Sequence, residues 1–434
     1  MKAVAKKIIK RLRGAGFKAY FVGGAVRDAL MGRRPKDYDI CTSARPEEIS
    51  SLFARSLMVG AAFGVVMVRM EGKVYQTATF RRDLGGSDGR HPDRVLFTED
   101  ERHDVERRDF TINGLLMDPF SGKIIDYVGG KRDIARRIVR TIGDPEQRFA
   151  EDRLRLLRAL RFATTLGFEL HETTAEAIRN AADRLSGLSA ERITEELRLI
   201  VVHPDRGAGL RKMHQLGLLR AILPEVALCE GITQDERFHP EGDVLEHTFR
   251  VLEALRKPDF VLALGALLHD VAKPPTRSAT DRIRFYGHDT RGAAMAETIC
   301  RRLRLSGKET KAIVELVGRH MHFVNLQKMR ESKLRRFLES PLAPSHVELH
   351  RADCLASHGK LDNIKYIAAM RRKWGRQPQV KEPLLMGRDL LEMGYAPGPL
   401  LGQILAEVSE LQYEGKLETP RQARDHVERR YPRT

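Results

Sequence analysis

Residues Phe21 to Ala44 read FVGGAVRDALMGRRPKDYDICTSA and join a glycine turn, a basic helix start and two alternating carboxylates. The carboxylates are Asp37 and Asp39. If "YDI" is a β-strand, residues i and i+2 point to the same face, so the two carboxylates converge where they can hold Mg²⁺. The stretch therefore predicts a strand, a turn, a helix and a second strand that together build a phosphate and metal site.

The glycine pair has a matching role. Gly24 with its neighbour lets the backbone approach a triphosphate closely, and Arg27 supplies positive charge at the start of the following helix. Taken singly, a Gly-Gly pair is most often a turn and an Asp-x-Asp a solvated loop. In this order they indicate nucleotidyl transfer, which uses two metal ions held by bridging carboxylates. We therefore predict Asp37 and Asp39 as catalytic metal ligands.

This run resembles the class II tRNA nucleotidyltransferase and bacterial poly(A) polymerase superfamily, whose head domains carry a Gly-Gly, Val-Arg-Asp and Asp-x-Asp signature. Three further segments are similar to family motifs. RRDFTINGLLMDP (Arg107 to Pro119) resembles the second motif, and EDRLRLLRALRFA (Glu151 to Ala163) resembles the nucleotide-selecting helix. SDGRHPDRVLF (Ser87 to Phe97) resembles the flexible loop that accompanies addition of the terminal A.

The predicted selecting helix contains Asp152 and Arg155, three residues apart and therefore expected on one helix face. A carboxylate only accepts and a guanidinium only donates, which suits the amino group and ring nitrogen of C and A and rejects U and G. The resemblance implies this base reading without a nucleic-acid template, and it adds Arg158 to the nucleotide-binding set. The alternative is an ordinary surface ion pair between Asp152 and Arg155, worth about 0.2 to 0.5 kcal/mol.

Arg108, Asp109 and Asn113 place donors and an acceptor at a predicted strand-to-helix junction. The resemblance implies that they hold the triphosphate and the ribose hydroxyl, and a capping role for Asp109 is the alternative. Similar enzymes place a third acidic residue where this chain has Gln76. Either two carboxylates suffice, or a neighbour such as Glu71 compensates.

A second group of polar residues lies further along the chain in the order His, His-Asp, His, His, Asp. Single histidines on helices are more often satisfied core residues than ligands. This order, however, resembles the HD phosphohydrolase superfamily, and a ligand set without thiolate suits Mn, Ni, Fe, Co or Mg. The resemblance implies hydrolysis of phosphoesters such as cyclic or terminal phosphates at RNA ends. The predicted ligands are His247, His269, Asp270, His288, His320 and Asp353.

The pattern along the chain predicts a multidomain protein with an α/β part followed by helical parts. The apolar runs around Glu71 to Lys73 indicate a β-hairpin in the first part. We expect a nucleotidyltransferase head with a mixed sheet over residues 1–140 and an all-helical neck over 141–225. An HD domain over 226–375 and a helical tail over 376–434 would follow, the tail either contacting tRNA or presenting a solvated face.

Composition limits the partners. The chain has 434 residues, a net charge of +17 and a pI near 9.8, which indicates a polyanionic partner. The chain has one Trp and few other aromatic residues that could stack on bases. This composition favours recognition of an RNA backbone over reading of the base sequence. Four scattered cysteines are expected to be buried thiols, and no long apolar run or signal pattern is present, so we expect no membrane association and a cytoplasmic location.

Together these features predict a template-independent tRNA nucleotidyltransferase that adds C, C and A, or only the A, from CTP and ATP. We expect Mg²⁺ in the head and a transition metal such as Ni²⁺ or Mn²⁺ at the HD site. The alternatives are a poly(A) polymerase, which shares the head, and an RNA-end phosphohydrolase with an inactive head.

Overall fold

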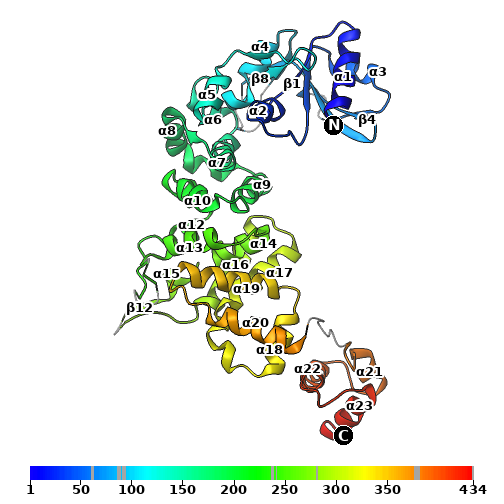
Figure 1. The fold of residues 1–434 in the computed structure, drawn as a ribbon, viewed down its shortest axis with the longest axis vertical. Coiled ribbons are helices and arrows are strands. Elements are labelled where there is room, and N and C mark those ends of the chain that lie inside the picture. Colours follow the sequence, from blue (N-terminus) through cyan, green and yellow to red (C-terminus); the bar gives the residue numbers. More distant parts are fainter. Residues whose placement is uncertain are drawn as a thin grey trace. The chain divides into compact units, whose positions relative to one another are not determined.

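The computed structural model describes residues 1–59, 63–85, 89, 94–235, 239–240, 242–279, 282–375 and 382–432. It divides into two compact units (Figure 1). The first comprises Met1–Leu228 with Arg301–Leu305, and the second comprises Cys229–Cys300 with Ser306–Thr434. Within the described residues, no helix has both the length and the apolar character that crossing a bilayer requires. All four cysteines are buried thiols, as predicted.

The head contains a seven-stranded mixed sheet in the order β3-β4-β5-β2-β1-β8-β9, with β2 and β5 parallel. This confirms the predicted α/β part. Its elements are α1 (Lys2–Gly14), β1 (Ala19–Val22), α2 (Gly24–Leu30), β2 (Asp39–Thr42), α3 (Pro46–Leu52), β3 (Ser56–Met58), β4 (Val65–Met70), β5 (Lys73–Thr79), β6 (Arg81–Leu84), β7 (Arg94–Phe97), α4 (Glu101–Glu106), the 3₁₀ turn η2 (Thr111–Asn113), β8 (Leu115–Met117), β9 (Ile124–Asp126), α5 (Gly130–Arg136) and β10 (Ile138–Val139).

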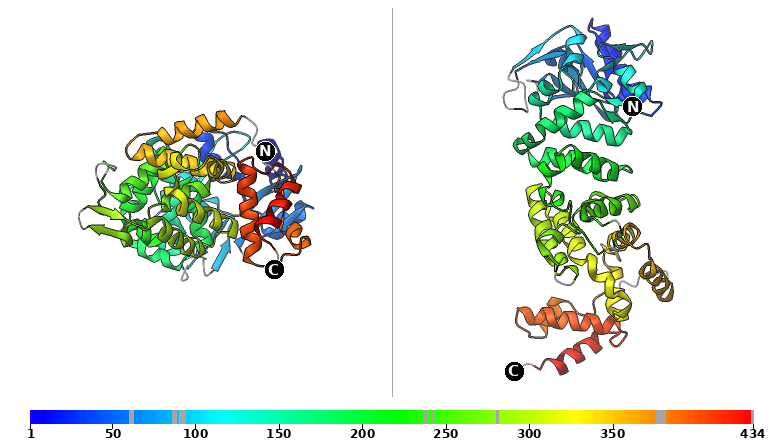
Figure 2. Two further views of the ribbon diagram at one scale, coloured as in Figure 1. Left: turned by 90° about the horizontal axis from the view of Figure 1, so that it is seen from below. Right: turned by 90° about the vertical axis from the view of Figure 1, so that its left-hand side faces the viewer.

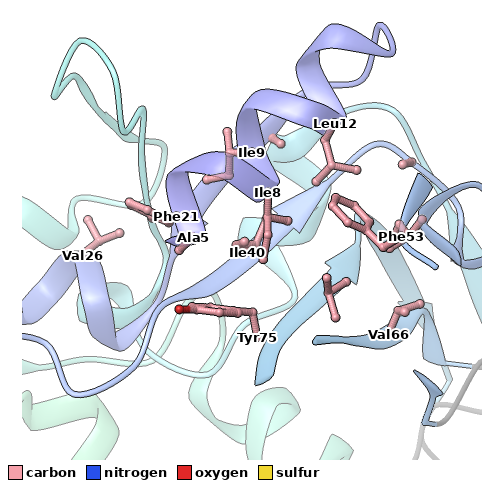
Figure 3. Close-up of a cluster of buried hydrophobic side chains, with 14 of the residues drawn as sticks. Ala5, Ile8, Ile9, Leu12, Phe21, Val26, Ile40, Phe53, Val66 and Tyr75 are labelled. Atoms are coloured by element: carbon pink, nitrogen blue, oxygen red, sulfur yellow. The ribbon is translucent and has the colours of Figure 1, made fainter. Parts of the chain in front are cut away.

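Helix α1 covers the sheet with one apolar stripe. Ile8, Ile9 and Leu12 recur at helical spacing, and all three are fully buried. They pack in one cluster with Phe21 of β1 and Ile40 of β2, as Figure 3 shows. This packing fixes the two strands whose ends carry the glycine turn and the carboxylates.

The β4–β5 hairpin confirms the predicted strand pair and places Gln76. Glu71 and Gly72 both have positive φ, as a two-residue hairpin turn requires. The parallel register pairs Ile40 with Thr77, so Gln76 is the neighbour of Asp39 on the adjacent strand. Glu71 forms an ion pair with Lys7 at the far end of the hairpin, so the hypothesis that it compensates for the missing acid is wrong.

The neck is mainly helical, and its helices form separate layers below the sheet within the first unit (Figure 2). It is not all-helical as predicted, because β11 (Glu169–Leu170) pairs with β10. Helix α7 contacts both α9 and α10. The neck elements are α6 (Pro145–Glu151), α7 (Leu154–Leu166), β11 (Glu169–Leu170), α8 (Glu172–Ala181), the 3₁₀ helix η3 (Ala182–Gly187), α9 (Ala190–Val201), α10 (Arg206–Gln215), α11 (Leu218–Ile222) and α12 (Pro224–Ala227).

The described residues of the second unit are almost wholly helical and include one short hairpin, β12–β13. Its elements are α13 (Val244–Ala254), α14 (Phe260–Leu268), α15 (Lys273–Thr276), β12 (Arg277–Ala279), β13 (Ile283–Phe285), α16 (His288–Arg302), α17 (Gly307–Arg319), the 3₁₀ segment η4 (His320–Lys328), α18 (Glu331–Glu339), α19 (Ala343–Ala356), α20 (Asp362–Trp374), α21 (Gly387–Glu392), α22 (Pro399–Tyr413) and α23 (Pro420–Arg430). The last three helices have a small apolar core of their own.

Gly130 allows helix α5 to approach the turn that carries Asn113. A Cβ at Gly130 would lie 2.1 Å from the carbonyl oxygen of Thr111. Because α5 lies this close to η2, the Thr111 hydroxyl can donate a hydrogen bond to the buried carboxylate of Asp133, at 2.8 Å.

We expect Gly130→Ala to lower the free energy of unfolding by about 1 to 3 kcal/mol, because a backbone atom must move to admit the methyl group. Urea unfolding followed by circular dichroism measures the change. Gly14→Ala is the control, since a Cβ there meets no atom within 4 Å. Equal stabilities of the two variants would contradict the assignment.

Candidate functional site

Asp37 and Asp39 lie where β1 ends and β2 begins. Val22, the last residue of β1, pairs with Asp39, the first residue of β2. Asp37 precedes the strand, so the prediction that both carboxylates lie on the strand is wrong for Asp37; the chain turns away into α2 after Val22 and leaves Asp37 no strand partner. Burial and the nearby Asp37 raise the pKa of Asp39, and Arg108 opposes this rise. A cation between two carboxylates that repel each other stabilises their ionised forms, so this pair is suited to hold a metal ion.

Two guanidinium groups lie over the glycine turn. Gly23, with φ of +69°, caps α2, and a Cβ there would lie 3.7 Å from Nη1 of Arg108. A Cβ at Gly24 would lie 3.6 Å from Nη2 of Arg27. Arg108 is anchored by the fully buried Asp104, whose carboxylate accepts from Nη2 at 2.8 Å. The structure thus brings the predicted turn, Arg27 and Arg108 together.

A continuous chain of polar contacts connects α2 to the neck. Arg27 donates to Oδ1 of Asn113 at 2.8 Å, and Nδ2 of Asn113 donates to Oδ1 of Asp109 at 3.1 Å. Arg158 of α7 donates from Nε and Nη2 to Oδ2 of Asp109 at 2.9 and 2.6 Å. Burial raises the pKa of Asp109, but Arg158 and Asn113 outweigh it and lower that pKa to about 2.

The surroundings of Asp109 differ from the prediction. Arg108 and Asp109 follow α4 and precede η2 and β8, so they lie between a helix and a strand rather than at a strand-to-helix junction. The carboxylate of Asp109 also accepts from the Phe110 backbone N–H at 2.8 Å, which is a local backbone bond and not a helix cap. Asp109 is therefore held on both sides, by the backbone N–H of Phe110 and by Arg158.

Asp152 and Arg155 do not share a continuous helix, so that prediction is wrong. Helix α6 ends at Glu151, Asp152 is extended with φ of −148°, and α7 begins at Leu154. The break occurs because the Asp152 carboxylate accepts from the Leu154 N–H at 3.1 Å, as Asp side chains do when they compete with the helix ladder. The alternative of an Asp152–Arg155 ion pair is also wrong, because each residue has another partner.

Those partners fix both side chains. Arg192 of α9 donates from Nη2 to both oxygens of Asp152 at 2.9 and 3.2 Å. Arg155 donates to Glu151 at 2.7 Å and to the backbone carbonyl of Arg107 at 3.2 Å. The last contact joins α7 to the segment that carries Arg108 and Asp109.

The segment expected to be a flexible loop falls mostly outside the described residues, which omit 86–88 and 90–93. Of the described part, Arg94–Phe97 forms β7 and pairs with β6. The carbonyl of Gly89 accepts from the backbone N–H of Arg153 at 3.1 Å. The described part of this segment therefore contacts the helix break directly beside Asp152.

In the second unit, all six predicted HD ligands come together. They form two groups whose ligand atoms lie within 4.8 Å of one another: His247, His269 and Asp353 in one, and Asp270, His288 and His320 in the other. Oδ2 of Asp270 lies 3.2 Å from Nε2 of His269, and Oδ1 lies 3.5 Å from Nε2 of His288. Asp270 therefore lies between the two groups, where its two oxygens can serve two metal ions.

Backbone carbonyls orient three of the histidines. Nδ1 of His269, His288 and His320 lies 2.7, 2.7 and 2.6 Å from the carbonyl oxygen three residues earlier. A proton donated from Nδ1 leaves the Nε2 lone pair for a metal. Burial lowers the pKa of His320 to about 4, so the ring stays neutral, as a ligand must. Nε2 of His269 is buried beside the Asp270 carboxylate, and this donor set of imidazoles and carboxylates fits a divalent metal.

Lys273, which follows Asp270 by three residues, is a further residue of this site that the sequence pattern did not single out. Its buried ammonium lies 2.6 Å from Oδ2 of Asp270 and donates to Gln234 at 2.6 Å. The spacing His-Asp-x-x-Lys is the signal that identifies it. Beside these groups lies a pocket of about 280 Å³, whose walls include Lys273, His288, His320 and Tyr286.

Three family models match the chain in the order of these segments. The poly A polymerase head domain matches residues 19–140, the probable RNA and SrmB-binding site of polymerase A matches 167–229, and the HD domain matches 244–357. The fold and the two sites thus define a nucleotidyltransferase head joined to a neck and an HD domain.

Similar proteins match along nearly the whole chain. The A-adding tRNA nucleotidyltransferase of Deinococcus radiodurans is 35% identical and covers 95% of each chain. The CCA-adding enzyme of Lactobacillus helveticus is 32% identical over 95% of this chain and 93% of its own length. The crystal structure of the Bacillus stearothermophilus CCA-adding enzyme in complex with CTP superposes with a TM-score of 0.72, at 29% identity, over 99% of this chain and 97% of that one. The chain belongs to the tRNA nucleotidyltransferase family.

Proposed function

We propose that this tRNA nucleotidyltransferase adds A, or C, C and A, to the 3′ ends of tRNA from ATP and CTP, and releases pyrophosphate. The observation that supports it best is the unbroken chain from Arg27 through Asn113 and Asp109 to Arg158, beside the Asp37 and Asp39 pair. The two full-length relatives carry the two alternatives in their names, one A-adding and one CCA-adding.

Each group in the head has a task in this reaction. Asp37 and Asp39 would hold divalent metal, with Mg²⁺ as our proposal; when bound, it activates the attacking 3′-hydroxyl and neutralises the leaving pyrophosphate. Gly24 lets the backbone approach the triphosphate, and Arg27 and Arg108 neutralise it from either side of the turn.

On the ribose side, Asn113 and Asp109 orient the nucleotide, while Arg158 keeps Asp109 ionised and therefore an acceptor. Asp152 accepts from the exocyclic amino group of C or A, and Arg155 donates to the ring nitrogen. Oδ1 of Asp152 accepts from both Arg192 and the Leu154 N–H, whereas Oδ2 accepts from Arg192 and has a second lone pair for a base.

The first test is Asp39→Ala, with tRNAs ending before the first C, after CC and after CCA as substrates. We expect incorporation to fall on the order of a thousandfold, because metal ligands contribute several kcal/mol to the transition state, while tRNA affinity stays within a few-fold. Circular dichroism controls for folding. Near-normal incorporation by this variant would show that the Asp37 and Asp39 pair does not hold the catalytic metal.

The same substrates identify the reaction in the parent protein. Addition of A only to the end after CC marks an A-adding enzyme, and addition of all three residues marks a CCA-adding enzyme. A long ladder of A on any RNA would contradict the proposal and indicate a poly(A) polymerase.

We expect Asp152→Ala and Arg155→Ala to relax the choice against UTP and GTP. Loss of one hydrogen-bonding partner costs on the order of 1 to 3 kcal/mol, which erodes discrimination by about ten- to a hundredfold. Incorporation rates of all four nucleotides into tRNA ending in CC measure the effect. Equal slowing with all four nucleotides would show that both residues are structural.

The ligand groups around Asp270 favour a second activity, hydrolysis of phosphoesters at RNA ends with a transition metal such as Ni²⁺ or Mn²⁺. Asp270→Asn removes the charge between the two ligand groups and keeps the side-chain volume. We expect this variant to lose bound Mn²⁺, measured by equilibrium dialysis, and to lose hydrolysis of a 2′,3′-cyclic phosphate by at least about a hundredfold.

Nucleotide addition to a hydroxyl-ended tRNA should remain within twofold in Asp270→Asn, and Asp39→Ala should show the opposite pattern. Absence of hydrolysis by the parent with every metal in a Mg, Mn, Ni, Co and Zn panel would contradict the second activity and leave the first intact.

For the domain organisation we retain four segments, 1–140, 141–225, 226–375 and 376–434. We assign the last segment to tRNA contact, because α23 presents several exposed arginines to phosphates. These are Arg421, Arg424, Arg429 and Arg430.

A further inference from the structure

The ring of Phe162 on α7 is surrounded by three guanidinium groups. Phe162 is only 6% exposed. The Cζ atoms of Arg161, Arg27 and Arg158 lie 3.9, 5.3 and 5.5 Å from the centre of its ring. Phe110 meets the ring edge-on with centroids 5.6 Å apart, which holds it in place. The face of an aromatic ring attracts cations because its quadrupole is negative there.

The cations around this ring come from both parts of the nucleotide site. Arg27 belongs to α2 in the head, directly after the glycine turn, whereas Arg158 and Arg161 belong to α7 in the neck. Phe162 is therefore a contact through which α7 holds the guanidinium of Arg27.

Each of the three guanidiniums also has a carboxylate partner. Arg27 pairs with Asp28, Arg158 with Asp109 and Arg161 with Glu196. A triphosphate that approaches Arg27 repels the carboxylate of Asp28 and competes with it for the same N–H groups. The ring of Phe162 is neutral and occupies no N–H group, so its hold on Arg27 persists when the phosphates arrive.

We infer that Phe162 is a positioning residue for nucleotide binding, which keeps Arg27 against α7 while Arg27 binds the triphosphate. The inference rests on the proposed function, because it takes Arg27 as a triphosphate ligand. Phe162 thus contributes to the affinity of the protein for the nucleotide without touching the nucleotide itself.

The test is Phe162→Leu, which keeps an apolar side chain but removes the π-face. We expect KM for both ATP and CTP to rise about fivefold or more with kcat within twofold, because the lost contact acts on ground state and transition state alike. Phe162→Tyr keeps the π-face and should stay within twofold of the parent. Phe168→Leu is the matched control, since Phe168 is 3% exposed just after the end of α7 and has no cation over its ring among the described contacts.

A double-mutant cycle separates positioning from a general loss of structure. If Phe162 acts through Arg27, then adding Phe162→Leu to Arg27→Ala should change KM no further. Three results would each overturn the inference. The KM shifts of Phe162→Leu and Phe168→Leu could be equal, the KM of Phe162→Tyr could differ from that of the parent as much as the KM of Phe162→Leu does, or the effects on KM could be additive in the cycle. An unchanged KM in Arg27→Ala alone would instead show that the proposed triphosphate role of Arg27 is wrong, and the inference falls with it.

Discussion

The ion pair between the buried Asp109 and the half-buried Arg158 is the contact on which the proposed nucleotide site depends. It joins the segment after α4 to α7, and so connects the sheet of the head to the first helices of the neck. A buried carboxylate without a cation would be neutral or would cost several kcal/mol, so Asp109 requires Arg158. Because Asp109 then orders Asn113, and Asn113 orders Arg27, the position of α7 is transmitted to the glycine turn.

The sequence predicted the strongly local features well. The glycine turn and the β-hairpin each depend on residues within a few positions of one another, and both are present. The six residues predicted as HD ligands also lie together, in two groups. For these residues, the order of His and Asp along the chain was enough to predict that they lie together, although they come from five separate segments.

The errors have a shared physical origin. The helix expected from Glu151 breaks because Asp152 bonds the backbone two residues on and takes Arg192, forty residues away, as its partner. Periodicity cannot reveal such competition, because a partner distant in sequence decides it. Likewise, Asp37 falls outside β2 because β1 has already ended, and the length of a strand depends on its neighbour in the sheet.

The pairing of every site arginine with a carboxylate has a consequence for how substrate enters. Arg27, Arg108 and Arg158 face Asp28, Asp104 and Asp109, so these guanidiniums add little unpaired positive charge to the site despite the +17 of the chain. The surplus charge that attracts a polyanion must therefore lie elsewhere on the surface. If Arg27 binds the triphosphate as proposed, phosphate replaces the carboxylate of Asp28 at that guanidinium, whereas the pair of Arg158 with Asp109 stays in place.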